Sequence, residues 1–101
     1  MRFIMNVRIP HKEFNAAVKD GSAGAKLKRI LDALKPEAAY FTSQQGRRTA
    51  VLVVDLPDVS KIPAVAEPWF LTFSGDVEFY PVMTPADLAQ AGLDALGMQW
   101  G

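Results

Sequence analysis

Alternating apolar and polar positions predict four strands along the chain. The clearest segment, Arg2–Ile9, places these apolar side chains on one side: Phe3, Met5, Val7 and Ile9. Its opposite side carries Arg2, Ile4, Asn6 and Arg8. The other strands are predicted at Glu37–Ser43, Arg47–Leu56 and Asp76–Met83.

The chemistry of the strands predicts their places in a sheet. Ala50–Val54 is apolar at every position, which indicates a strand covered on both faces and therefore central. Glu37–Ser43 is more polar and suits a less buried place. Pro81 lacks an N–H and places the last strand at an edge. We expect the second and third strands to form a hairpin through Gln44-Gln45-Gly46.

A helical region is predicted between the first two strands. His11–Lys19 forms its first part, and Asp20-Gly21 interrupts it. A second part begins behind Ser22, a predicted N-cap, and ends before Pro36. Its apolar stripe consists of Leu27, Ile30, Leu31 and Leu34.

The segment from Val59 to Phe73 permits two interpretations. Ser74-Gly75-Asp76 could be the turn of a hairpin, but apolar residues recur at spacings of three and four through the whole segment. We therefore predict a helix, kinked at Pro68 and stopped by Gly75 in a left-handed conformation. Asp58 or Ser60 can cap its start, and its predicted core residues are Trp69, Phe70 and Phe73.

A last helix is predicted from the sequence Thr84-Pro85-Ala86-Asp87, which has the form of a capping box with proline at the first helical position. We expect the helix to reach about Leu96, with Gly92 weakening it. The tail Met98–Gly101 is apolar enough to dock on another surface.

The order of elements predicts a single α+β domain over residues 1–101, with a ferredoxin-like β-α-β-β-α-β arrangement, a four-stranded antiparallel sheet and an added C-terminal helix. Two helices cover one sheet face. The other face carries Ile4, Asn6, Arg8, Glu78, Tyr80 and Val82. Such a face is too apolar to leave bare in water and too polar for an ordinary core. We therefore expect a homodimer that encloses a partly polar cavity.

Composition excludes several classes of function. The 101 residues include 11 Lys and Arg, 11 Asp and Glu, one His and no Cys. This balance favours neutral or mixed partners, and no Cys-based or His-rich metal site is expected in one chain. The start of the chain does not resemble a signal peptide and no segment is long enough to span a membrane, so a cytoplasmic location is expected.

The chain as a whole resembles a known superfamily. The segments MRFIMNVRIPHKEF, TAVLVVDL and EFYPVMTP follow one another in the layout of the dimeric α/β-barrel superfamily. Proteins of the muconolactone isomerase kind are similar in layout, and the likeness is greatest to small bacterial members without an established activity. The resemblance implies two sheets packed face to face across a dimer around a small-molecule pocket. The superfamily includes isomerases, cofactor-independent monooxygenases and haem-degrading enzymes, and no catalytic residue of theirs matches a position here.

The candidate site residues come from the face opposite the helices. Glu78 is a candidate proton carrier, and His11, the only histidine, is a second candidate general base. The candidate ligand-binding residues are Asn6, Arg8, Tyr40 and Tyr80, although the pattern does not fix which way Tyr40 faces. The alternative is an ion pair between Arg8 and Glu78 that joins strands or subunits. His11 is better explained as a surface residue in the first turn of a helix.

Two other motifs are better explained structurally. Asp20–Lys26 superficially resembles a phosphate loop, but it lacks the required spacing and follows a helix. The basic residues Lys26, Lys28, Arg29, Lys35, Arg47 and Arg48 do not indicate RNA, because TAVLVVDL has no aromatic side chain for base stacking. We expect no metal, cofactor, nucleic-acid partner or membrane partner. Three functions stay open: a small-molecule binder, a cofactor-independent isomerase or monooxygenase, and a structural dimer without a ligand site.

Overall fold

The protein is an α+β domain, described here over all 101 residues by a computed structural model. The body consists of β1 (Arg2–Ile9), α1 (His11–Asp20), α2 (Ala23–Leu34), β2 (Ala38–Gln44), β3 (Arg47–Asp55), the 3₁₀ turn η1 (Val59–Lys61), α3 (Ile62–Phe73) and β4 (Asp76–Pro81). Two short helices follow, α4 (Pro85–Ala89) and α5 (Leu93–Trp100). The predicted order of strands and helices in the body is confirmed.

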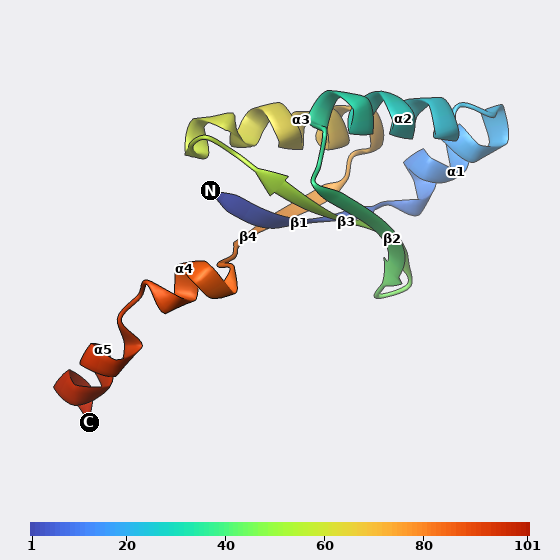
Figure 1. The fold of residues 1–101 in the computed structure, drawn as a ribbon. Helices are drawn as coiled ribbons and strands as arrows, with labels where there is room; N and C mark the ends of the chain where they lie inside the picture. Colours follow the sequence, from blue (N-terminus) through green and yellow to red (C-terminus); the bar gives the residue numbers. More distant parts are fainter.

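The four strands form one antiparallel sheet in the order β2-β3-β1-β4. The predicted central places of β1 and β3 are therefore confirmed, as are the edge places of β2 and β4. Figure 1 shows α1, α2 and α3 on one face of the sheet, while the other face is uncovered. The sheet does not close into a barrel within the chain.

The hydrophobic core lies between the sheet and the helices. It is built from every second residue of β1 and β3, together with side chains of α3, and its largest fully buried members include Trp69, Phe73, Met5, Ile9 and Leu52. Phe70, predicted to be buried, is 40% exposed. It follows Trp69 directly, and the 100° turn between adjacent helical positions carries it away from the sheet.

The hairpin between β2 and β3 is tighter than predicted. Gln44 belongs to the strand, so only Gln45 and Gly46 form the turn, with φ of 54° and 74°. Two positive φ angles are those of a type I′ turn, whose twist suits a two-residue hairpin. The shorter loop leaves the Gln44 side chain available to the sheet.

The predicted start of α2 behind Ser22 is confirmed, whereas the predicted end of α3 needs correction. Ser22 stands at the N-cap of α2 but makes no capping bond; instead its N–H donates to Asp20 Oδ1 at 2.8 Å. Ser74, and not Gly75, takes the left-handed position after α3, with φ of 54°. Gly75 serves a packing role, because a Cβ there would lie 3.3 Å from Val7 Cγ1. Asp58, one of the two predicted caps, accepts a bond from the Ser60 N–H, but it does so at the start of the 3₁₀ turn η1 that leads into α3; the N-cap of α3 itself is Lys61.

Helix α3 contains Pro68 in its interior and continues through it to Phe73. The helical interpretation of this segment is therefore correct, and the hairpin interpretation is wrong. Burial of Trp69 and Phe73 on the C-terminal side of the proline supplies roughly 1.5–3 kcal/mol for each side chain, which offsets the cost of the missing hydrogen bond.

The predicted last helix is in fact two helices. Thr84 and Asp87 form the expected capping box at the start of α4. Gly92 then takes a left-handed conformation, with φ of 72°, and separates α4 from α5. Neither helix buries a residue, so the apolar tail is not docked on the body of its own chain. None of the helices in this structure has the length and hydropathy needed to cross a bilayer.

Candidate functional site

The candidate residues share the uncovered face of the sheet. In the register, Asn6 lies opposite Val51 on one side and Glu78 on the other. Val51 in turn lies opposite Tyr40, so the direction of Tyr40, open in the sequence, is toward this same face. We call this surface the open face. Its members include Ile4, Asn6, Arg8, Tyr40, Gln44, Val51, Val53, Glu78 and Tyr80.

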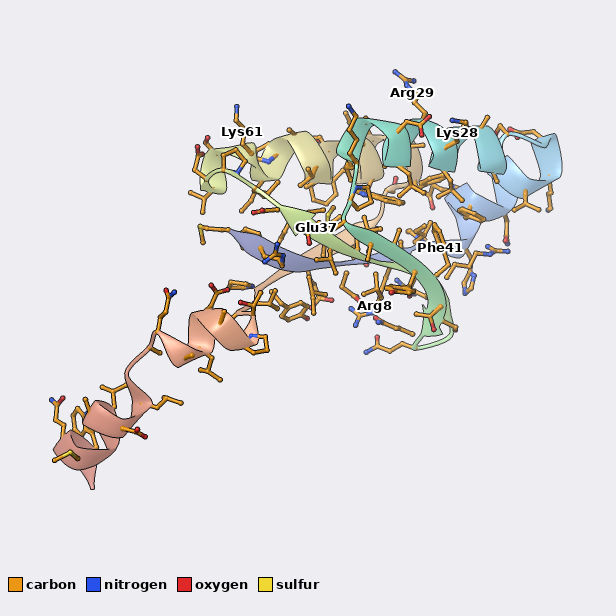
Figure 2. The ribbon with its side chains drawn as sticks, in the orientation of Figure 1. Arg8, Lys28, Arg29, Glu37, Phe41 and Lys61 are labelled. Carbon is orange, nitrogen blue, oxygen red and sulfur yellow. The ribbon has the colours of Figure 1, made fainter.

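An ion pair and a phenol meet at the β1–β4 side of the open face. Arg8 Nη1 donates to Glu78 Oε1 at 2.5 Å, and the Tyr80 hydroxyl donates to Glu78 Oε2 at 2.7 Å. Both carboxylate oxygens are therefore engaged. Arg8 Nε is buried without a hydrogen-bond partner. Figure 2 shows Arg8 on the side of the sheet away from α2, whose Lys28 and Arg29 are also labelled.

A pair of amides continues the polar network toward β2. Asn6 Nδ2 donates to Gln44 Oε1, and Gln44 Nε2 donates to Asn6 Oδ1, both at 2.9 Å. Asn6 is 6% exposed, which makes it one of two buried polar residues in the chain. A reciprocal amide pair leaves each side chain one further N–H and one further acceptor site. Polar groups thus run across the sheet from Gln44 through Asn6 to Glu78.

Apolar side chains frame this network. Ile4 lies opposite Val53 and Tyr80, and it is 36% exposed. Tyr40 and Tyr80 are 66% and 47% exposed. The open face therefore presents aromatic and aliphatic surface around a hydrogen-bonded centre.

Electrostatics hold Glu78 in its charged form. The hydrogen bond from Tyr80, followed by the charge of Arg8, lowers the pKa of Glu78 below its ordinary value. The same carboxylate raises the pKa of Tyr80 above its ordinary value. At neutral pH the pair is a carboxylate and a neutral phenol. A carboxylate with a lowered pKa and both oxygens occupied is a weak proton acceptor, so the geometry suits binding better than proton transfer.

His11 lies apart from this network. It is the first residue of α1, is exposed, and takes part in none of the side-chain hydrogen bonds or ion pairs of the structure. The structure brings together Asn6, Arg8, Glu78 and Tyr80, with Tyr40 on the same face, and does not bring His11 to them. No three acidic or histidine side chains gather in a geometry that could hold a metal ion.

A comparison of the chain with protein-family models identifies its family. The model described as a domain of unknown function (DUF3303) matches residues 1–96. The chain belongs to the DUF3303 family. A comparison with curated proteins found no match to it.

The sequence analysis of this DUF3303 chain missed one member of the polar network, Gln44. Gln44 was assigned to the hairpin loop, and its amide reaches Asn6 only because the turn is confined to Gln45 and Gly46. The signal was weak: Gly46 suits the second position of a two-residue turn, but Gln45 is not one of the residues, Asn, Asp or Gly, that favour positive φ at the first position. That turn extends β2 by one residue and places Gln44 in register with Arg47.

The larger hollows of the single chain lie on the helix side. One, of about 700 Å³, is a groove between α2 and α3, and its lining includes Ile30, Pro68 and Leu71. The other, of about 330 Å³, lies under Phe14, Leu27 and Phe41. Neither contains a residue of the polar network. The first groove also carries Lys26, Arg29 and Glu67, but these side chains form no hydrogen bond or ion pair with one another, whereas the polar network is a hydrogen-bonded cluster. The open face needs a second surface to become concave.

The Tyr80 phenol gives a pH test of the network. We expect Tyr80 to titrate above its ordinary pKa of 10.0, because ionisation would place a phenolate beside the Glu78 carboxylate. A raised folded-state pKa also means that this group's contribution to stability is present below pH 10 and is lost as the pH rises through the raised value.

The measurement is absorbance at 295 nm in a Tyr40→Phe background, where Tyr80 is the only tyrosine. Glu78→Gln should move the titration toward lower pH, whereas Glu67→Gln on α3 should leave it in place. Identical titrations of the Glu78→Gln variant and its parent would show that the Tyr80–Glu78 contact does not form.

Proposed function

We propose that the DUF3303 chain forms a homodimer in which two open faces enclose a binding site for a small organic molecule of mixed polarity. The observation that carries this proposal is the network from Gln44 through Asn6 to Glu78, Arg8 and Tyr80. Such a network amid apolar side chains is typical of ligand sites, where a few fixed polar groups orient a molecule held by apolar contacts.

The need for a second copy follows from the exposure of the open face. Ile4, Tyr40 and Tyr80 present apolar surface to water, and half-buried Val51 and Val53 lie between them. A single chain leaves this surface uncovered, while a symmetric partner would cover it with the same side chains. The result would be the two-sheet arrangement of the dimeric α/β-barrel superfamily, which the sequence resembles.

The charges favour a neutral ligand. Arg8 pairs with Glu78, Arg47 Nη1 lies 3.7 Å from Asp76, and Arg2 Nη2 lies 3.0 Å from Glu37. These basic groups therefore already have acidic partners, and an added carboxylate would have to compete for them. Further hydrogen-bonding capacity belongs to the amides of Asn6 and Gln44, to Tyr40 and to the unpartnered Nε of Arg8. A molecule with a ring or short chain and one amide, carbonyl or hydroxyl group matches these partners.

The same geometry favours binding over turnover. An isomerase or monooxygenase that needs no cofactor requires a group poised to take a proton, and Glu78 is held as a fully bonded carboxylate. In a binding protein this arrangement is useful, because it fixes Arg8 and Tyr80 in place before a ligand arrives.

Side-chain amide resonances provide the test. In ¹⁵N-labelled protein, neutral fragments from benzamide to cyclohexanone should shift the Asn6 and Gln44 NH₂ signals, with the Asn15 and Gln90 signals as internal controls. Glu78→Gln should weaken this binding at least about tenfold, since a lost charge-assisted bond is worth roughly 1.5–3 kcal/mol. The matched control is Glu67→Gln on α3.

The structural alternative predicts a different pattern. If the open face only joins subunits, no fragment shifts the two amides, and Glu78→Gln lowers dimer stability without any effect on a ligand. That result would contradict the binding function and leave the dimer intact.

A further inference from the structure

Residues 84–101 form a helical arm that extends away from the body. Figure 1 shows α4 and α5 leaving the end of β4 on the side of the sheet opposite α2 and α3. The molecule measures 60 × 28 × 19 Å, with a radius of gyration of 17.1 Å. A compact domain of this length would have a radius of gyration of about 13 Å. The projecting arm therefore explains why the radius of gyration exceeds that of a compact domain of this length.

The arm carries an apolar face with nothing packed on it. Leu93, Leu96 and Trp100 follow the i, i+3, i+7 spacing of one helix face and are 55%, 43% and 80% exposed. Helices of five and eight residues are too short to be stable alone in water. The DUF3303 match reaches residue 96, so α4 and the start of α5 are part of the family domain. Both helices need a surface to pack on.

Charge and placement indicate which surface that is. All 11 Lys and Arg precede residue 84, together with nine of the 11 Asp and Glu, so the body has an excess of two positive charges. The arm has Asp87 and Asp94 and no basic residue. A body of one copy is thus electrostatically complementary to the arm of another. The arm also projects on the side of the open face, beside the space that a covering copy would occupy.

We propose that the arm of each chain packs across the body of a second copy, with the apolar face of α5 buried in the contact. This inference rests on the homodimer of the proposed function. In a two-fold dimer both arms make the same contact, so the arm of each copy packs on the body of the other. The arms would then stabilise the pairing of the open faces and close the side of the cavity between them.

Sedimentation equilibrium with matched arm variants tests the contact. We expect the full chain to be a dimer, and Leu96→Ser combined with Trp100→Ser to raise its dissociation constant at least about tenfold, because a buried Trp is a typical hot spot of such contacts and Leu96 loses its apolar burial. The matched control is Met98→Ser. Met98 is 89% exposed, and it lies on the side of α5 opposite Leu96 and Trp100. It should change the dissociation constant by less than about twofold.

Tryptophan fluorescence gives an independent readout. Trp69 is fully buried in the body, so a change in emission on dilution reports on Trp100. Emission should shift to longer wavelength as the dimer dissociates. A dimer that the double variant leaves equally tight would overturn the arm contact while the open-face dimer stands. A chain that is monomeric throughout would overturn both, and a Trp100 already shielded in the monomer would show that the arm folds onto its own body.

Discussion

Replacing Trp69 with alanine should destabilise the domain by about 3–5 kcal/mol. Trp69 is fully buried between α3 and the sheet, with its ring centroid 6.4 Å from that of Phe73. The cavity left by an indole cannot collapse easily among β-sheet side chains. Thermal unfolding followed by circular dichroism should show a loss of roughly 12 °C or more in Tm, at about 4–8 °C per kcal/mol for a domain of this size.

The matched control is Leu71→Ala on the same helix. Leu71 is 83% exposed, so its truncation should change the unfolding free energy by no more than about 0.5 kcal/mol. Trp69→Phe should cost less than Trp69→Ala, because it keeps aromatic volume and removes an indole N–H that is buried without a partner. Equal losses for the Trp69→Ala and Leu71→Ala variants would contradict the position of α3 over the sheet.

Replacing Asn6 with alanine should cost about 1–3 kcal/mol, because the half-buried amide of Gln44 loses its partner. Asn6 and Gln44 exchange two hydrogen bonds across β3, so Gln44→Ala should cost a similar amount. The double variant should cost less than the sum of the two single losses. Urea denaturation of the four proteins in this cycle measures the coupling directly.

Thr42→Ala is the control for the Asn6 prediction. Thr42 is exposed on the open face and its side chain makes none of the hydrogen bonds of the network. Its truncation should leave stability within about 0.5 kcal/mol of the parent. Additive losses at Asn6 and Gln44 would show that the two amides do not interact in solution.

The sequence predicted the sheet because its strands differ in chemistry. The apolar run Ala50–Val54 and the proline at position 81 placed β3 at the centre and β4 at an edge, and both placements are confirmed. The helical spacing from Val59 to Phe73 was also a better guide than the apparent hairpin turn. Helix α3 runs to Phe73, as that spacing predicts. In these segments local pattern and tertiary packing agree.

The errors arose where backbone conformation or exposure decides the outcome. Ser74 takes the left-handed position that glycine usually takes, and Gly75 is needed for its lack of a Cβ beside Val7. Gly92 takes a left-handed conformation that separates α4 from α5, where periodicity alone predicted one helix. Phe70 shares the apolar spacing of its neighbours and yet points away from the sheet, because the helix contacts the sheet along a narrower stripe than the apolar residues cover.

For the candidate site, alternation alone predicted that Asn6, Arg8, Glu78 and Tyr80 share a face. It could not reveal the contacts, since an ion pair depends on the register between strands that lie about 70 residues apart in the chain. The direction of Tyr40 and the part played by Gln44 likewise depend on the β2–β3 register, which a two-residue turn sets. The role that we propose for the arm involves a second copy, which the pattern of one chain does not describe.

Native mass spectrometry of protein purified from its own source tests the central claim most directly, because it reports the number of chains and any retained ligand together. The account predicts a species of twice 11.1 kDa that carries additional small-molecule mass, and predicts that this mass is lost or reduced in Glu78→Gln. A stable monomer at all concentrations, or a dimer that binds nothing and whose Asn6 and Gln44 amides no fragment shifts, would contradict it.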